Sequence, residues 1–139
     1  MLKSFPLLGL SLMFYVGLHY VADFTQPWYQ AEAFAIVLSS GDEWQISGGD
    51  MFLMSALTLL ALELVRSTRS DRRSLLNHSL EVLVFVIALT LFVAHPGYGN
   101  STFFGLLAMT LIDFVVGFII TTATARRDIA VGHTQHPSL

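Results

Sequence analysis

The stretch that most constrains the fold is residues 101–125, which carry no charged residue except Asp113, close to the centre. As an α-helix this stretch rises about 36 Å, which exceeds the bilayer's hydrocarbon thickness of about 30 Å. A carboxylate at mid-depth opposes insertion by about 2.5–3.5 kcal/mol, so we expect it to face protein or water rather than lipid. The stretch predicts a transmembrane helix that holds one buried acid.

A helical wheel divides this stretch into two faces. The small and polar face carries Thr102, Thr110, Asp113, Gly117, Thr121 and Thr124, with Gly105 at its edge. The bulky face carries Phe104, Leu107, Leu111, Phe114, Val115, Phe118 and Ile119. Small residues let helices approach closely, so we expect the first face to pack on helices and the second to meet lipid.

The composition extends this interpretation to the whole chain of 139 residues. Charged residues make up 12% and hydrophobic residues 54%, whereas soluble domains are about 25% charged. We therefore expect an all-α integral membrane protein in which one domain, 1–127, is a four-transmembrane-helix bundle, followed by a disordered cytoplasmic tail, 128–139. The expected helices are 5–22, 50–66, 77–95 and 101–125. The net charge of −3 disfavours nucleic acid as a partner.

The segment between the first two expected helices contains a shorter pattern. Residues 27–38 begin with Pro27, which suits a first helical position, and they are too few to cross a membrane. Trp28, Tyr29 and Trp44 are aromatic residues of the kind that lie at the headgroup level. This segment predicts a short interfacial helix.

The basic residues predict the orientation. They occur at Lys3, at Arg66, Arg69, Arg72 and Arg73, and at Arg126 and Arg127. The segments 23–49 and 95–100 contain none. By the positive-inside rule both termini are cytoplasmic, and we expect a multi-pass protein of a bacterial inner membrane.

Three acids are the main candidates for chemistry. Asp113 either carries a proton or a cation, or hydrogen-bonds to a residue such as Thr110 and fixes helix packing. Glu63 and Glu81 are expected near the cytoplasmic ends of their helices, either as the inner part of a relay to Asp113 or in ion pairs.

Two basic partners are placed for those ion pairs. Arg66 follows Glu63 by three residues and His78 precedes Glu81 by three, which puts each pair on one helix face. We expect these pairs to hold the cytoplasmic ends of the helices together.

The opposite end of the bundle carries a second group. His19 and Asp23 are four residues apart, and His95 is expected at a comparable depth. The three can bind a divalent metal, His19 and His95 can hold a haem b, or all three are simply solvated at the interface.

The sequence favours a function without catalysis. The chain has no cysteine and no spacing typical of a catalytic nucleophile with its base. We expect no enzyme and no cofactor, but a subunit or accessory component that packs on a membrane partner or on its own copies through the polar face of the 101–125 helix. The alternative is a small proton-linked transporter or ion-binding protein with Asp113 as the carrier, and a more distant one is a haem- or metal-binding protein.

Overall fold

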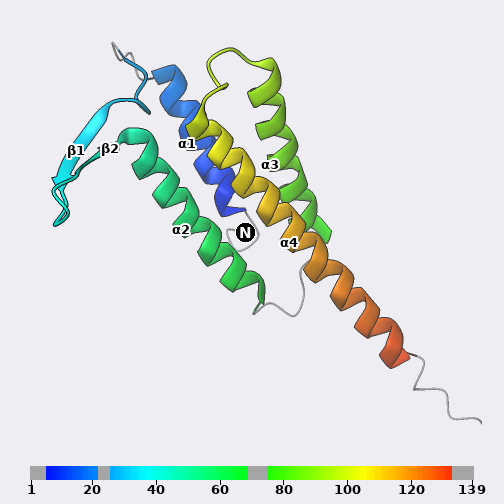
Figure 1. The fold of residues 1–139 in the computed structure, drawn as a ribbon. Coiled ribbons are helices and arrows are strands. Elements are labelled where there is room, and N and C mark those ends of the chain that lie inside the picture. The colour runs from blue at the N-terminus through cyan, green and yellow to red at the C-terminus, as the bar shows by residue number, and fades with distance from the viewer. Residues whose placement is uncertain (1–5, 22–25, 69–74, 133–139) are drawn as a thin grey trace, which may run out of the picture.

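The fold is known from a computed structural model, which describes residues 6–21, 26–68 and 75–132. Within these residues it contains four helices and two strands. They are α1 (Leu7–Val21), β1 (Glu32–Val37), β2 (Glu43–Ser47), α2 (Gly48–Thr68), α3 (Leu75–Ala94) and α4 (Ser101–Gly132). The helices run alternately up and down, so that α1 and α3 begin at the same end at which α2 ends (Figure 1). We call this the lower end, and the end that carries the strands the upper end.

The prediction of four helices is confirmed. The bounds of α2 and α3 differ from the expected ones by one or two residues at each end, and α4 is longer than expected. The polar tail was expected to begin at residue 128, but α4 continues to Gly132, so that expectation is wrong for residues 128–132. Alanine and arginine are good helix formers, and the segment after Ala125 contains no breaker before Gly132. The expected tail beyond Gly132 lies outside the described residues.

Two helices in the described part of the chain are long and apolar enough to cross a membrane. They are Gly48–Ser67 in α2 and Ser101–Ala123 in α4, with 20 and 23 residues. Only 28% and 33% of the residues in their most apolar windows are buried, unlike the core helix of a soluble protein. The apolar parts of α1 and α3 are shorter, and a bundle of four spans stays a prediction.

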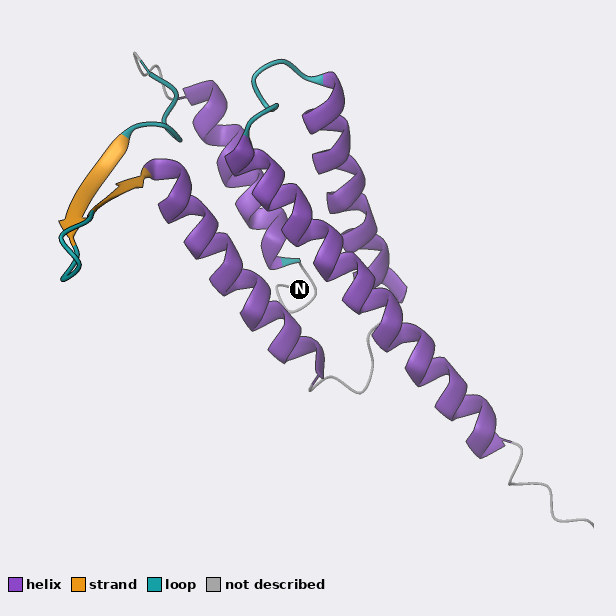
Figure 2. Cartoon of the chain, in the orientation of Figure 1, coloured by secondary structure: helices purple, strands orange, loops and turns teal. Residues whose placement is uncertain are grey.

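The expected interfacial helix over 27–38 is wrong. Residues 32–37 and 43–47 instead form an antiparallel hairpin, in which Ile36 pairs with Trp44 (Figure 2). Gly41 closes the turn with φ of 91°, a conformation that glycine adopts without strain. The hairpin therefore forms because a turn at Gly41 brings two segments rich in aromatic and branched side chains together.

Local capping determines where two of the helices begin. The Asp50 amide donates to Ser47 Oγ at 3.2 Å, and the Ser47 amide donates to the Asp50 carboxylate at 3.0 Å, which is a capping box at the start of α2. Asn100 caps α4, because its Oδ1 accepts a hydrogen bond from the Phe103 amide at 2.9 Å.

The core consists of an aromatic upper part and a lower part that includes acids. In the upper part the rings of Tyr15 and Phe103, both fully buried, meet edge to face with centroids 4.9 Å apart. Helix α4 lies in contact with the other three helices. Helix α4, which carries one of the buried acids of the lower part, therefore contacts every other helix of the bundle.

Candidate functional site

Three acids from three different helices meet in the lower half of the bundle. Glu63 of α2, Glu81 of α3 and Asp113 of α4 each offer a carboxylate oxygen, and these oxygens lie within 4.8 Å of one another. Their side chains are almost fully buried, with relative exposures of 8%, 5% and 3%. We call these residues the carboxylate cluster. In the described part of the chain it is the only group of three or more His, Asp or Glu residues so close together.

The three acids meet because they lie at the same distance from the upper ends of their helices. At about 1.5 Å per residue, Asp113 lies about 18 Å below Ser101, Glu81 about 20 Å below Ala94 and Glu63 about 23 Å below Gly48. The sequence predicts Asp113 in mid-membrane and the two glutamates nearer the cytoplasm. The structure instead brings all three together at one level.

Helix α1, which carries none of the three acids, contacts the carboxylate cluster through its backbone. The amide of Leu7 donates to both carboxylate oxygens of Glu63 at 3.1 and 3.0 Å, and the amide of Leu8 donates to one of them at 3.3 Å. These are the first amides of α1, which have no acceptor within their own helix. Glu63 therefore places negative charge at the positive end of the α1 dipole, which stabilises both the charge and the helix start. This contact is not predictable from the sequence, because it joins residues more than fifty positions apart.

His78 connects the carboxylate cluster to the surface. Its Nδ1 lies 3.3 Å from Glu81 Oε2, and its side chain is 16% exposed. The ring stacks on Phe114 with centroids 5.7 Å apart, which fixes its orientation. The structure thus brings His78 and Glu81 together. The side chain of Arg66, the other expected basic residue, is exposed on α2.

The small and polar face of α4 is used within the chain. Thr110 and Asp113 are buried, and a Cβ added at Gly105 would lie 2.8 Å from a methyl group of Leu53 in α2. Thr110 Oγ1 donates to the Leu107 carbonyl in its own helix. On the bulky face, five of the seven expected side chains are exposed: Phe104, Leu111, Val115, Phe118 and Ile119.

Electrostatics limits the charge that the carboxylate cluster can carry. Two unit charges about 4 Å apart repel by about 4 kcal/mol at an effective dielectric constant of about 20. Three buried carboxylates at such distances do not all ionise unless a cation lies among them. The carboxylate cluster is therefore a candidate site for a proton or another cation.

At the upper end, His19 and His95 both contact Tyr98. The ring centroids of His19 and Tyr98 are 4.6 Å apart, and those of His95 and Tyr98 are 5.1 Å apart. Burial raises the pKa of Tyr98 above its ordinary value. Both ring nitrogens of His95 have polar neighbours, namely the Tyr20 hydroxyl at 3.3 Å and the Pro96 carbonyl at 3.0 Å. Asp23 lies outside the described residues, and a metal or haem held by this group stays a prediction.

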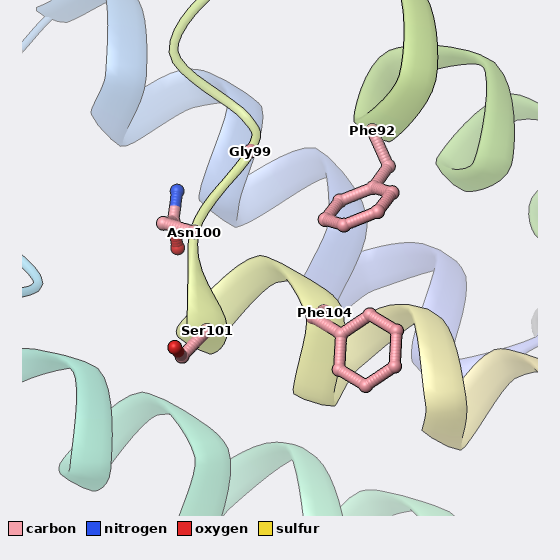
Figure 3. A pocket seen from close by; sticks show the side chains of 5 residues that line it. All are labelled: Phe92, Gly99, Asn100, Ser101 and Phe104. Carbon is pink, nitrogen blue, oxygen red and sulfur yellow. The ribbon is translucent and has the colours of Figure 1, made fainter.

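An open hollow of about 360 Å³ lies near the start of α4. Its wall includes Phe92 and Phe104, whose rings lie on one side of the chain while the side chains of Asn100 and Ser101 point to the other (Figure 3). Asn100 pairs with the Tyr15 hydroxyl, its Nδ2 donating at 2.9 Å. The hollow is lined by no acid or histidine and lies at the start of α4, whereas Asp113 of the carboxylate cluster lies further along that helix.

Comparisons of this chain with known protein families, with curated proteins and with solved structures find no match.

Proposed function

We propose that this chain is a multi-pass membrane protein that binds and exchanges protons at the carboxylate cluster, as a proton-linked transporter does. The observation that carries the proposal is the approach of three buried carboxylates, from three helices, to within 4.8 Å. Buried acids within a membrane are costly and typically belong to ion or proton pathways. The proton is the simplest cation that relieves their repulsion.

The exterior of the helices supports a location in the membrane. Large apolar side chains are exposed on all four helices, among them Met13 of α1, Met54 of α2, Val93 of α3 and Ile119 of α4, each between 57% and 75% exposed. Exposed apolar surface on this scale is unusual for a soluble monomer and typical of a surface in contact with lipid.

The charge pattern supports one orientation in that membrane. The basic residues of the sequence belong to the N-terminal segment, to the end of α2 and the connection after it, and to the C-terminal part of α4. The helix ends that flank these segments all belong to the lower end of the bundle (Figure 1). By the positive-inside rule the lower end faces the cytoplasm, in a bacterial inner membrane, and the hairpin lies on the other side.

His78 is the group we propose for proton entry. An imidazole releases and accepts protons near neutral pH, so it can pass them between water and a buried acid. His78 is partly exposed and lies 3.3 Å from Glu81. Protons from the cytoplasmic side then reach Glu81 through His78 and are shared with Asp113 and Glu63.

That the chain is an accessory subunit stays a prediction. The surface that would meet its partner differs from the expected one. The polar face of α4, which we expected to meet a partner, contacts α2 within the same chain at Gly105 and Leu53. A partner membrane protein or a second copy would use another surface of the bundle.

Proton flux into liposomes tests the proposal. We would reconstitute the protein with an entrapped pH dye, impose a membrane potential and follow the internal pH. We expect faster acidification with the wild-type protein than with Asp113→Asn, because the variant lacks the central acid of the carboxylate cluster.

The matched control is Glu43→Gln, which removes an exposed acid from the hairpin. It should carry protons at the wild-type rate. Wild-type flux equal to that of protein-free liposomes, or unchanged flux in Asp113→Asn, would contradict the proposal.

A further inference from the structure

The hairpin has one apolar face that the bundle covers only at its base. Phe34 pairs with Ile46 and Ile36 pairs with Trp44, so these four side chains project from the same side of the two strands. Ile46 is buried, whereas Phe34, Ile36 and Trp44 are 46%, 43% and 45% exposed. We call these four residues the hairpin's apolar face.

Ile46 lies close to the junction of the hairpin with the bundle. Strand β2 runs directly into α2, and Ile46, one residue before the end of β2, is buried. The other three residues of the hairpin's apolar face project from the same side of the strands as Ile46. The hairpin projects sideways beside the upper part of α2 (Figure 1). That part of α2 exposes Met51 and Met54, each at least half exposed, so the upper end of the bundle carries exposed apolar side chains on α2 as well as on the hairpin.

We propose that the hairpin's apolar face lies on the lipid bilayer, at the boundary between headgroups and acyl chains of the leaflet around the upper end. A two-stranded hairpin without a covering surface is only marginally stable in water, so this face needs an occupant. Tryptophan prefers the interfacial depth, where its ring is in apolar surroundings and its N–H near water. The proposal rests on the membrane location proposed above and not on proton binding.

The charges of the hairpin agree with this orientation and specify the lipid. Asp42 and Glu43 lie at the turn, away from the bundle, and Glu43 pairs with Val37 on the opposite face. Residues 26–65 contain no lysine or arginine. An acidic hairpin suits a zwitterionic surface better than an anionic one, because anionic headgroups would repel it.

Depth-dependent fluorescence quenching tests this contact. The chain has two tryptophans, so Trp28→Phe leaves Trp44 as the only one. We would reconstitute this variant in zwitterionic vesicles whose lipids carry bromine either near the headgroup or near the end of the acyl chain. We expect a blue-shifted Trp44 emission that shallow bromines quench more strongly than deep ones.

Two variants without Trp28 and Trp44, both replaced by Phe, provide the controls. Leu111→Trp puts a tryptophan on the exposed face of α4 at mid-depth, where deep bromines should quench most. Val37→Trp puts one on the opposite face of the hairpin, where quenching should be lost.

The outcomes separate the two proposals. Quenching of Leu111→Trp without quenching of Trp44 would overturn the hairpin contact and leave the membrane location standing. No quenching of either would overturn both. Equal quenching of Trp44 and Val37→Trp would overturn the assignment of the face. A Trp44 emission that lipid leaves unquenched, and that changes with the protein-to-lipid ratio, would mean that a second copy covers the face.

Discussion

The first amides of α1 donate to Glu63, a side chain of another helix, so a single residue joins the start of one helix to a buried group of acids. Asp113 belongs to the same carboxylate cluster, where a further negative charge would add to the repulsion. Charges kept for function commonly reduce stability, and their removal then stabilises the fold.

We therefore expect Glu63→Gln and Asp113→Asn to change stability in opposite directions. Glu63→Gln weakens charge-assisted hydrogen bonds and should lower the free energy of unfolding by about 1–2 kcal/mol. Asp113→Asn replaces the carboxyl by an amide of the same shape that cannot ionise, and it should leave stability unchanged or raise it. Thermal unfolding of the detergent-purified proteins measures both, with Glu43→Gln as the exposed control. Equal destabilisation by the two variants would show that the acids are equivalent packing groups.

His78 has a separable role, because its ring packs on Phe114 while its nitrogen contacts Glu81. The substitution His78→Phe keeps an aromatic ring against Phe114 and removes the proton-transferring nitrogen. We expect proton flux to fall by about tenfold or more, since a positioned acid–base group contributes at least that much to proton transfer. Flux at the wild-type rate would mean that protons enter by another route.

Helices α2 and α4 approach each other where glycines replace larger side chains. A Cβ at Gly49 would lie 2.8 Å from the Tyr29 carbonyl and 2.5 Å from Thr102 Oγ1 of α4. A backbone carbonyl cannot move aside as the end of a flexible side chain does, so a side chain at this position must displace the segment around Tyr29 or α2 itself.

We expect Gly49→Ala to lower the free energy of unfolding by about 1–3 kcal/mol. Gly17 of α1 offers the matched control, because nothing lies within 4 Å of a Cβ added there. Gly17→Ala should be neutral or stabilising by up to about 1 kcal/mol, since alanine is the better helix former. Chemical or thermal unfolding measures both, and a Gly49→Ala variant as stable as wild type would contradict the close contact.

At the level of elements, the sequence predicted the helices because long apolar runs end at glycine, proline or charged residues. It predicted the wrong structure for residues 27–38, where Ala31, Glu32 and Ala33 favour a helix locally. Pairing with residues 43–47 decides the outcome there, and a single segment does not reveal its partner strand.

The carboxylate cluster was predictable only in part. Its three members stand out in the sequence as the acids of apolar segments, but their common level depends on where each helix begins. The contact between Glu63 and the α1 amides was not predictable, because backbone donors leave no mark in the side-chain pattern.

For the whole molecule, the account requires the two ends of the bundle to face opposite sides of a membrane. The chain has no cysteine, so the labelling of a single introduced cysteine shows on which side of the membrane that position lies. We expect Ser40→Cys, in the turn of the hairpin, to react with a membrane-impermeant maleimide in intact cells. Ser138→Cys, near the C-terminus, should react only after the membrane is permeabilised. Labelling of both in intact cells would contradict the proposed orientation.

The proposed function requires an exchangeable proton in the carboxylate cluster. Its most direct test is the infrared spectrum of chelator-treated protein in liposomes at neutral pH. We predict a protonated-carboxyl C=O band that shifts in D₂O, because the proton exchanges with water, and that weakens in Asp113→Asn but not in Glu43→Gln. A spectrum without this band would contradict the proposal. A band that appears only after treatment with the chelator would also contradict it, because the carboxylate cluster would then hold a metal ion instead of a proton.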